Sequence, residues 1–267
     1  METLAAAALR CLLCTEPSVK LALSADVCAA WQAGDLALRD AGERLPATHT
    51  GGRPQRPRLV APRQLPKRGL GQVAGRVALL HAVAHIEFNA VNLAWDAVYR
   101  FADMPRAYYD DWVQVAADEA RHFGLLNARL AELGHAYGDF DAHNGLWEMA
   151  IKTADSALAR MALVPRVLEA RGLDVTPGMI TRLQQVEDHA SVAVLETILR
   201  EEVAHVAAGS RWFAYCCEQQ GLDPQPTFAG LLQRYMSTPP RPPFNRPARL
   251  AAGFSDAELD QLECTAL

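Results

Sequence analysis

The chain of 267 residues has no run of about 18 uninterrupted apolar residues, the length needed to span a bilayer. Its first residues do not resemble a secretory signal, because Glu2 stands where positive charge belongs and Arg10 interrupts the apolar run. Its six cysteines form no pattern typical of a secreted disulfide framework. We therefore expect a cytoplasmic protein with reduced thiols and no membrane partner.

A strong excess of one charge is also missing. The net charge is −5 at pH 7, which argues against a surface dominated by contacts with nucleic acid or an anionic membrane. A local basic patch is still compatible with this balance. Half of the residues are hydrophobic, which is enough for a substantial core.

Two Glu-x-x-His units are the main chemical feature of the sequence. They are Glu119 with His122 and Glu202 with His205. Residues three apart lie on one face of a helix, so each unit can direct one oxygen and one nitrogen ligand at the same point. Both units lie on stripes of apolar residues at helical spacing and should be buried. An isolated buried carboxylate is costly, and a metal ion would remove that cost.

Two further carboxylates complete the pattern. Glu87 is the one charged member of an apolar stripe that runs from Val73 to Val98. Glu169 is our preferred fourth carboxylate, because it precedes the second Glu-x-x-His unit by 33 residues and Glu87 precedes the first by 32. Asp155 and Glu148 on the same predicted helix are the alternatives.

One Glu from each of two helices, with a Glu-x-x-His from each of two others, is the ligand plan of ferritin-like carboxylate proteins. We therefore predict an all-α protein with a ferritin-like four-helix bundle. A long connection, residues 134 to 145, would join its two halves. Gly172 and residues 176–178 are expected to interrupt the path from Glu169 to Glu202, and a break in the fourth helix is expected near 187–189. The predicted helices cover 72–101, 105–133, 145–171 and 178–218.

The rest of the chain should cover this bundle. Two helices, at 3–15 and 17–41, would form a cap, and Ser255 with Glu258 forms a capping box that starts a last short helix. The predicted organisation is an N-terminal helical cap at 1–48, an extended basic Pro-rich strap at 49–70, the ferritin-like four-helix bundle at 71–220 and a C-terminal wrapping tail at 221–267.

The strap carries six basic residues and cannot form a long helix, because prolines interrupt it. We favour a structural role in which these side chains pair with surface acids, since no aromatic residue is interleaved with them. The alternative is a contact for an anionic substrate such as RNA, so that nucleic acid would bind only through residues 53–68. The basic residues are Arg53, Arg56, Arg58, Arg63, Lys67 and Arg68.

His81 and His85 lie one turn apart, on a face of their helix different from that of Glu87. One of them could be an extra ligand or a proton carrier. We favour hydrogen-bonded core or interface histidines, because a stripe offset by about 200° cannot reach the same centre.

Much of the sequence resembles a bacterial ferritin-like family known mainly as a domain of unknown function. The resemblance implies a ferritin-like fold and a dinuclear iron centre held by Glu87, Glu119, His122, Glu169, Glu202 and His205. It implies no substrate. The segments that carry it are RPQRP (53–57), HAVAHIEFNAVNLAWD (81–96), YYDDWVQVAADEARHFGLL (108–126), VPRVLEARGLDVTP (164–177), REEVAHVAAGSRWF (200–213) and PPFNRPARLAAGF (242–254).

Such a centre predicts an oxidase or hydroxylase that activates O2 with two iron ions, manganese or a mixed pair being possible. Its substrate would be a small molecule or a tRNA nucleoside, and an oxygenase would need an external electron donor. We expect a monomer or a homodimer. The alternatives are an iron-handling protein without an organic substrate and a helical interaction module.

Overall fold

The computed structural model describes residues 2–39, 46, 48, 50–65 and 69–265, and within them every regular element longer than an isolated β-bridge is a helix. The prediction of an all-α protein is therefore confirmed for these residues. The chain divides into two compact units, Met1–Trp147 and Glu148–Leu267. The four-helix bundle, which would draw helices from both units, stays a prediction.

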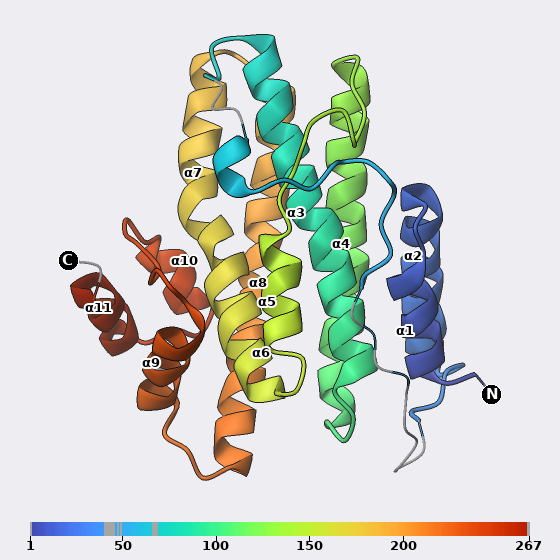
Figure 1. The fold of residues 1–267 in the computed structure, drawn as a ribbon, viewed down its shortest axis with the longest axis vertical. Coiled ribbons are helices and arrows are strands. Elements are labelled where there is room, and N and C mark those ends of the chain that lie inside the picture. The colour runs from blue at the N-terminus through green and yellow to red at the C-terminus, as the bar shows by residue number, and fades with distance from the viewer. Residues whose placement is uncertain (1, 40–45, 47, 49, 66–68, 266–267) are drawn as a thin grey trace. The chain divides into compact units, whose positions relative to one another are not determined.

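The first unit is built on two long helices, α3 and α4, that pack along one another (Figure 1). Their bounds differ by one residue from the predicted ones at each end. Helix α1 packs on α3, and α2 packs on α4. The four helices are α1 (Leu4–Leu13), α2 (Pro17–Ala33), α3 (Val73–Arg100) and α4 (Arg106–Glu132).

Local sequence explains where these helices begin and end. The Thr3 hydroxyl accepts a hydrogen bond from the Ala6 N–H and starts α1. Pro17 occupies the first turn of α2, where its missing N–H costs nothing. The prediction that this helix continues to residue 41 was wrong, because Gly34 takes φ +79° and ends it.

The segment from residue 50 to 65 is extended, with a single 3-10 turn at Pro62–Gln64. It lies on the first unit. The Gly52 N–H donates to the Leu12 carbonyl, Val60 and Ala142 share a backbone hydrogen bond of 2.8 Å, and Arg58 forms an ion pair of 2.6 Å with Asp141. Lys67 and Arg68 of the predicted strap lie outside the described residues.

Lys20 is a fully buried cation in the first unit that sequence analysis did not single out. Its ammonium group donates to the carbonyls of Cys11 and Leu12, at the end of α1, and to the side-chain oxygen of Asn92 on α3. Burial lowers the pKa of Lys20 to about 8. This side chain ties α1, α2 and α3 together.

The second unit is built on α7 and α8, which pack side by side (Figure 1). Only three residues, 186–188, connect them, so the two helices are antiparallel. Helix α5 (Gly145–Lys152) contains the boundary between the units. The remaining elements are α6 (Ala157–Leu163), the π-helix η2 (Val164–Glu169), α7 (Ala170–Gln185), α8 (His189–Gln219), α9 (Pro224–Tyr235), α10 (Arg246–Ala251) and α11 (Asp256–Thr265).

The predicted third and fourth helices need correction. The helix expected at 145–171 is interrupted before Ser156, whose hydroxyl caps α6. Helix α7 runs through Gly172 and Pro177 without a break, because its packing on α8 outweighs the local cost of proline. The real boundary is at Glu187, which takes φ +57°, and Asp188, which caps α8.

Two helices of the predicted wrapping tail were not identified from the sequence. Prolines stand in the first turns of both α9 and α10, where a missing N–H costs nothing. The side chains of Asp223 and Asn245 cap these helices. The predicted capping box of the last helix is present, because Ser255 and Glu258 each accept the other's backbone N–H.

Helix α3 is long and apolar enough to cross a membrane, but 72% of its most apolar stretch is buried inside the structure. It is the one such helix among the residues that the structure describes. Burial of this kind is typical of the core helix of a soluble protein. Cytoplasmic location remains a prediction.

Candidate metal centre

The first unit holds a buried cluster of two carboxylates around one histidine. Nδ1 of His122 on α4 lies 3.3 Å from a carboxylate oxygen of Glu87 on α3 and 3.6 Å from one of Glu119, one turn earlier on α4. The exposed fractions of these residues are 5% for Glu87, 1% for Glu119 and 0% for His122. Three of the six predicted ligands are therefore in contact within a single unit.

The helix pair explains how these side chains meet. Spacings of three and four residues place Glu87 on the same face of α3 as Ala84 and Val91, which are fully buried. On α4, Ala116 and Phe123 are likewise buried beside the Glu-x-x-His unit. Because α3 packs along α4, both polar stretches are shielded from water, and the cluster lies inside an apolar wall.

The electrostatics of this cluster favour a positive charge between the carboxylates. Burial alone would lower the pKa of His122, but the hydrogen bonds and charges of Glu119 and Glu87 outweigh it and raise the pKa to about 11. Without a metal, His122 is therefore an imidazolium at neutral pH. A divalent cation can supply the same compensation with more charge, and it takes the nitrogen lone pair that the proton occupies.

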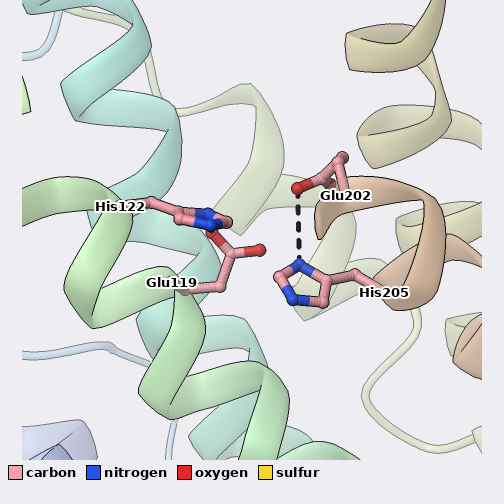
Figure 2. A group of neighbouring side chains, drawn as sticks. All are labelled: Glu119, His122, Glu202 and His205. Atoms are coloured by element: carbon pink, nitrogen blue, oxygen red, sulfur yellow. Dashed lines mark ion pairs between the residues drawn. The ribbon is translucent and has the colours of Figure 1, made fainter. Parts of the chain in front are cut away.

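The second unit carries a similar pair on α8. Nδ1 of His205 lies 3.4 Å from a carboxylate oxygen of Glu202, and both side chains are buried. Figure 2 draws this pair, with the ion pair marked, and also shows Glu119 and His122 on α4. Each unit thus contributes a buried Glu-x-x-His pair, and carboxylate oxygens and imidazole nitrogens are donors that iron, manganese and zinc accept.

The structure also separates the candidates for the remaining carboxylate. Glu169, at the end of the π-helix η2, is buried, with 6% of its surface exposed. Asp155 and Glu148 are exposed to solvent. A ligand of a buried centre has to be buried itself, so the geometry favours Glu169, and its role as a ligand stays a proposal.

His81 and His85 belong to the core of the first unit, as we favoured. Nε2 of His81 accepts a hydrogen bond from the Gly138 N–H. The ring of His85 lies between the Tyr137 hydroxyl, 2.8 Å from Nδ1, and the His143 carbonyl, 3.0 Å from Nε2. Burial lowers the pKa of both histidines to about 4, so they are neutral at physiological pH.

Three tyrosines near the turn between α3 and α4 pack and form hydrogen bonds to the backbone. Tyr99 donates to the Pro46 carbonyl, Tyr108 to the Ala97 carbonyl and Tyr109 to the Phe101 carbonyl. The contacts of Tyr108 and Tyr109 fix the α3–α4 connection.

Sequence analysis missed the π-helix and the buried Arg166 within it. Arg166 has only 3% of its surface exposed, and its guanidinium forms an ion pair of 2.6 Å with Glu258 of α11. The available signal was Pro165 inside an otherwise helical pattern, since a proline there must break, kink or widen the helix.

Comparison with known proteins gives a family without a known activity. Residues 13–260 match the family model described as "Protein of unknown function (DUF455)". The chain is 45% identical over 232 residues to an "Uncharacterized protein" of Haemophilus influenzae, and the match covers 84% of this chain and 81% of that protein. No solved structure matches the chain.

Proposed function

The chain belongs to the family of proteins of unknown function DUF455, and because that family defines no activity, we propose a function from the buried side chains: a ferritin-like dinuclear metal protein that activates O2. The six proposed ligands are Glu87, Glu119, His122, Glu169, Glu202 and His205. We propose two iron ions as the bound metals. Manganese or a mixed pair fits the same donors.

The observation that carries the proposal is the cluster of Glu87, Glu119 and His122. Three ionisable side chains lie almost fully buried at ion-pair distance, although burying charged groups without compensation is costly. A second buried Glu-x-x-His pair, with a buried glutamate 33 residues before it, repeats the same donor types in the other unit. Such repetition is the ligand plan of ferritin-like carboxylate proteins.

The roles of the side chains follow from their chemistry. When bound, the two metal ions would supply the electrons that reduce O2. The carboxylates of Glu87, Glu119, Glu169 and Glu202 would hold the ions through their oxygens. His122 and His205 would each offer one nitrogen. The buried apolar residues around these helices would keep water from the centre.

We propose that the substrate is a small molecule or a tRNA nucleoside. An external electron donor is needed if the product carries an oxygen atom from O2. In the extended basic segment, Arg58 is held by Asp141, while Arg56 and Arg63 are exposed. The ion pair of Arg58 supports the structural role of the segment, and the exposed Arg56 and Arg63 are the cations that would meet an RNA backbone in the alternative role.

The proposal is tested by anaerobic loading with ferrous ion, followed by exposure to O2 while oxygen uptake and the near-ultraviolet and visible spectrum are recorded. The parent chain should consume O2 and develop oxygen-dependent absorption. His205→Ala should do neither, whereas Glu196→Ala, which removes an exposed carboxylate from the same helix, should behave as the parent does. Oxygen uptake that is equal in all three proteins, or absent in all, would contradict the proposal.

A further inference from the structure

The six-residue π-helix η2 separates α6 from α7 and ends at Glu169. Pro165 explains why it forms. Proline has no N–H to donate to the carbonyl four residues earlier, and its ring would clash with that carbonyl in an α-helix, so the turn widens. Each residue inserted into an α-helix by such a turn rotates all following residues by about 100°. The π-helix therefore decides which way Glu169 faces.

One side of this π-helix is fixed by α8. A Cβ atom added at Gly209 would lie 2.3 Å from both Cβ and Cγ of Pro165, so only glycine allows the proline ring to sit there. Gly209 is one turn beyond His205 on the same face of α8. The close contact is thus made by the stripe of α8 that carries the proposed ligands Glu202 and His205.

The antiparallel arrangement of α7 and α8 relates this contact to the position of Glu169. Helix α8 runs opposite to α7, into which η2 continues directly. Because the two segments run in opposite directions, Glu169, four residues after Pro165, should lie beside His205, one turn before Gly209. Helix geometry then predicts that the contact between Pro165 and Gly209 sets Glu169 at the height of the Glu-x-x-His pair.

The other side of the π-helix is fixed by the C-terminal helices. The guanidinium of Arg166 lies over three aromatic rings and forms an ion pair with Glu258, which is itself held by the Ser255 backbone N–H and hydroxyl. Stacking on aromatic faces suits the planar guanidinium. The rings are those of Phe213 at 4.8 Å, Phe228 at 4.4 Å and Phe254 at 4.5 Å.

From these contacts we infer that the π-helix Val164–Glu169 is a positioning device that directs Glu169 toward the metal ligands of α8, held by Pro165 at Gly209 and by Arg166 among the aromatic rings. This rests on the proposed function, since Glu169 is a ligand only in that proposal. This positioning would also involve the C-terminal helix α11, because its Glu258 holds Arg166 of the π-helix. Pro165, Gly209 and Arg166 are positioning residues, because they act on the metal only through Glu169.

Three variants separate positioning from stability. Gly209→Ala forces the proline ring away from α8. Pro165→Ala returns an N–H to the helix and favours an ordinary α-helical turn, so it should fold and turn Glu169 away from its place. The matched control is Gly172→Ala on α7, where an added methyl group meets nothing within 4 Å.

The test is equilibrium titration of each metal-free protein with ferrous ion without O2, together with the melting temperature and helical content before metal is added. Gly209→Ala and Pro165→Ala should bind one of the two ions about 10-fold to 100-fold more weakly, the loss typical when the support of a ligand is removed. Pro165→Ala should show this loss while it stays folded, as helical content and a cooperative melting transition report, and Gly172→Ala should bind as the parent does.

Parent-like binding by a folded Gly209→Ala or Pro165→Ala protein would overturn the inference and leave the proposed function intact. If Gly209→Ala does not fold, the result for Pro165→Ala decides. A parent chain that binds no ferrous ion would overturn the proposed function, and the inference with it.

Discussion

Nδ1 of His122 on α4 lies 3.3 Å from a carboxylate oxygen of Glu87 on α3, and the two residues are 35 positions apart in the sequence. This contact joins the two long helices of the first unit at a buried point. With Glu119 on its other side, the imidazole is held between two negative charges.

Metal-free protein should keep His122 protonated well above the usual pKa of histidine, because Glu119 and Glu87 raise its pKa to about 11. A pKa raised on folding gives stability that is fully present below the unfolded pKa of about 6.5 and is lost as the pH rises through the folded value. Nuclear magnetic resonance should show a charged ring at pH 8, and Glu87→Gln should lower the pKa. A ring that titrates near 6.5 in the parent would refute this.

Metal binding should compete with protons at the same cluster. A metal ion takes the Nδ1 lone pair of His122, so one proton leaves that ring as the ion enters. The apparent affinity should rise about tenfold for each pH unit below the folded pKa, as for any single exchanged proton. Calorimetry in buffers of different ionisation heat measures the protons released, and an affinity that is independent of pH would contradict the prediction.

Lys20 should make the fold more stable in mild alkali. Burial lowers its pKa to about 8, whereas in the unfolded chain it would be near 10.5. Between these values the unfolded state binds the extra proton, so the free energy of unfolding should rise with pH, by about 1.4 kcal/mol per unit for this group. His122, whose pKa is raised to about 11, contributes a slope of opposite sign over this range, so the effect of Lys20 is the difference between two proteins. Urea unfolding at pH 8 to 10 should give a slope about 1.4 kcal/mol per pH unit more positive for the parent than for Lys20→Met. An identical slope in both proteins would exclude a contribution from Lys20.

Acid should destabilise the first unit through His81 and His85. Burial lowers the pKa of both to about 4, so the unfolded chain binds more protons between pH 4 and 6.5 and the free energy of unfolding falls as the pH falls through this range. His81→Gln should reduce the fall, provided that its side-chain oxygen accepts the Gly138 N–H instead. If the variant and the parent lose stability equally between pH 6.5 and 4, His81 is not responsible.

The sequence predicted the two long helices of the first unit closely. An unbroken apolar stripe defined α3, and Pro105, directly before α4, marked the turn, so both helices were placed within one residue at each end. Glu87 was found because it is the single charge in that stripe. Such patterns are local, and in this helix pair the tertiary packing favours the same helices that the local sequence favours.

The second unit was predicted less well, because its prolines act in different ways. Pro177 lies inside α7 and Pro165 widens a helix, whereas Pro224 begins one. Each proline disfavours a continuous α-helix by the same local effect, and the packing of neighbouring helices decides whether the helix continues, widens or begins there. The buried ion pair of Arg166 with Glu258 joins residues 92 positions apart, and no local pattern could show it.

The most direct test of the account is the metal content of protein purified from iron-supplemented cells, measured by elemental analysis. The proposed ligand set predicts about two metal ions per chain, the number that four carboxylates and two histidines hold in proteins of this plan. Glu119→Ala should lose metal, and Glu196→Ala on the exposed face of α8 should not. A parent chain without metal, whose melting temperature does not change when ferrous ion is added, would contradict the metal centre.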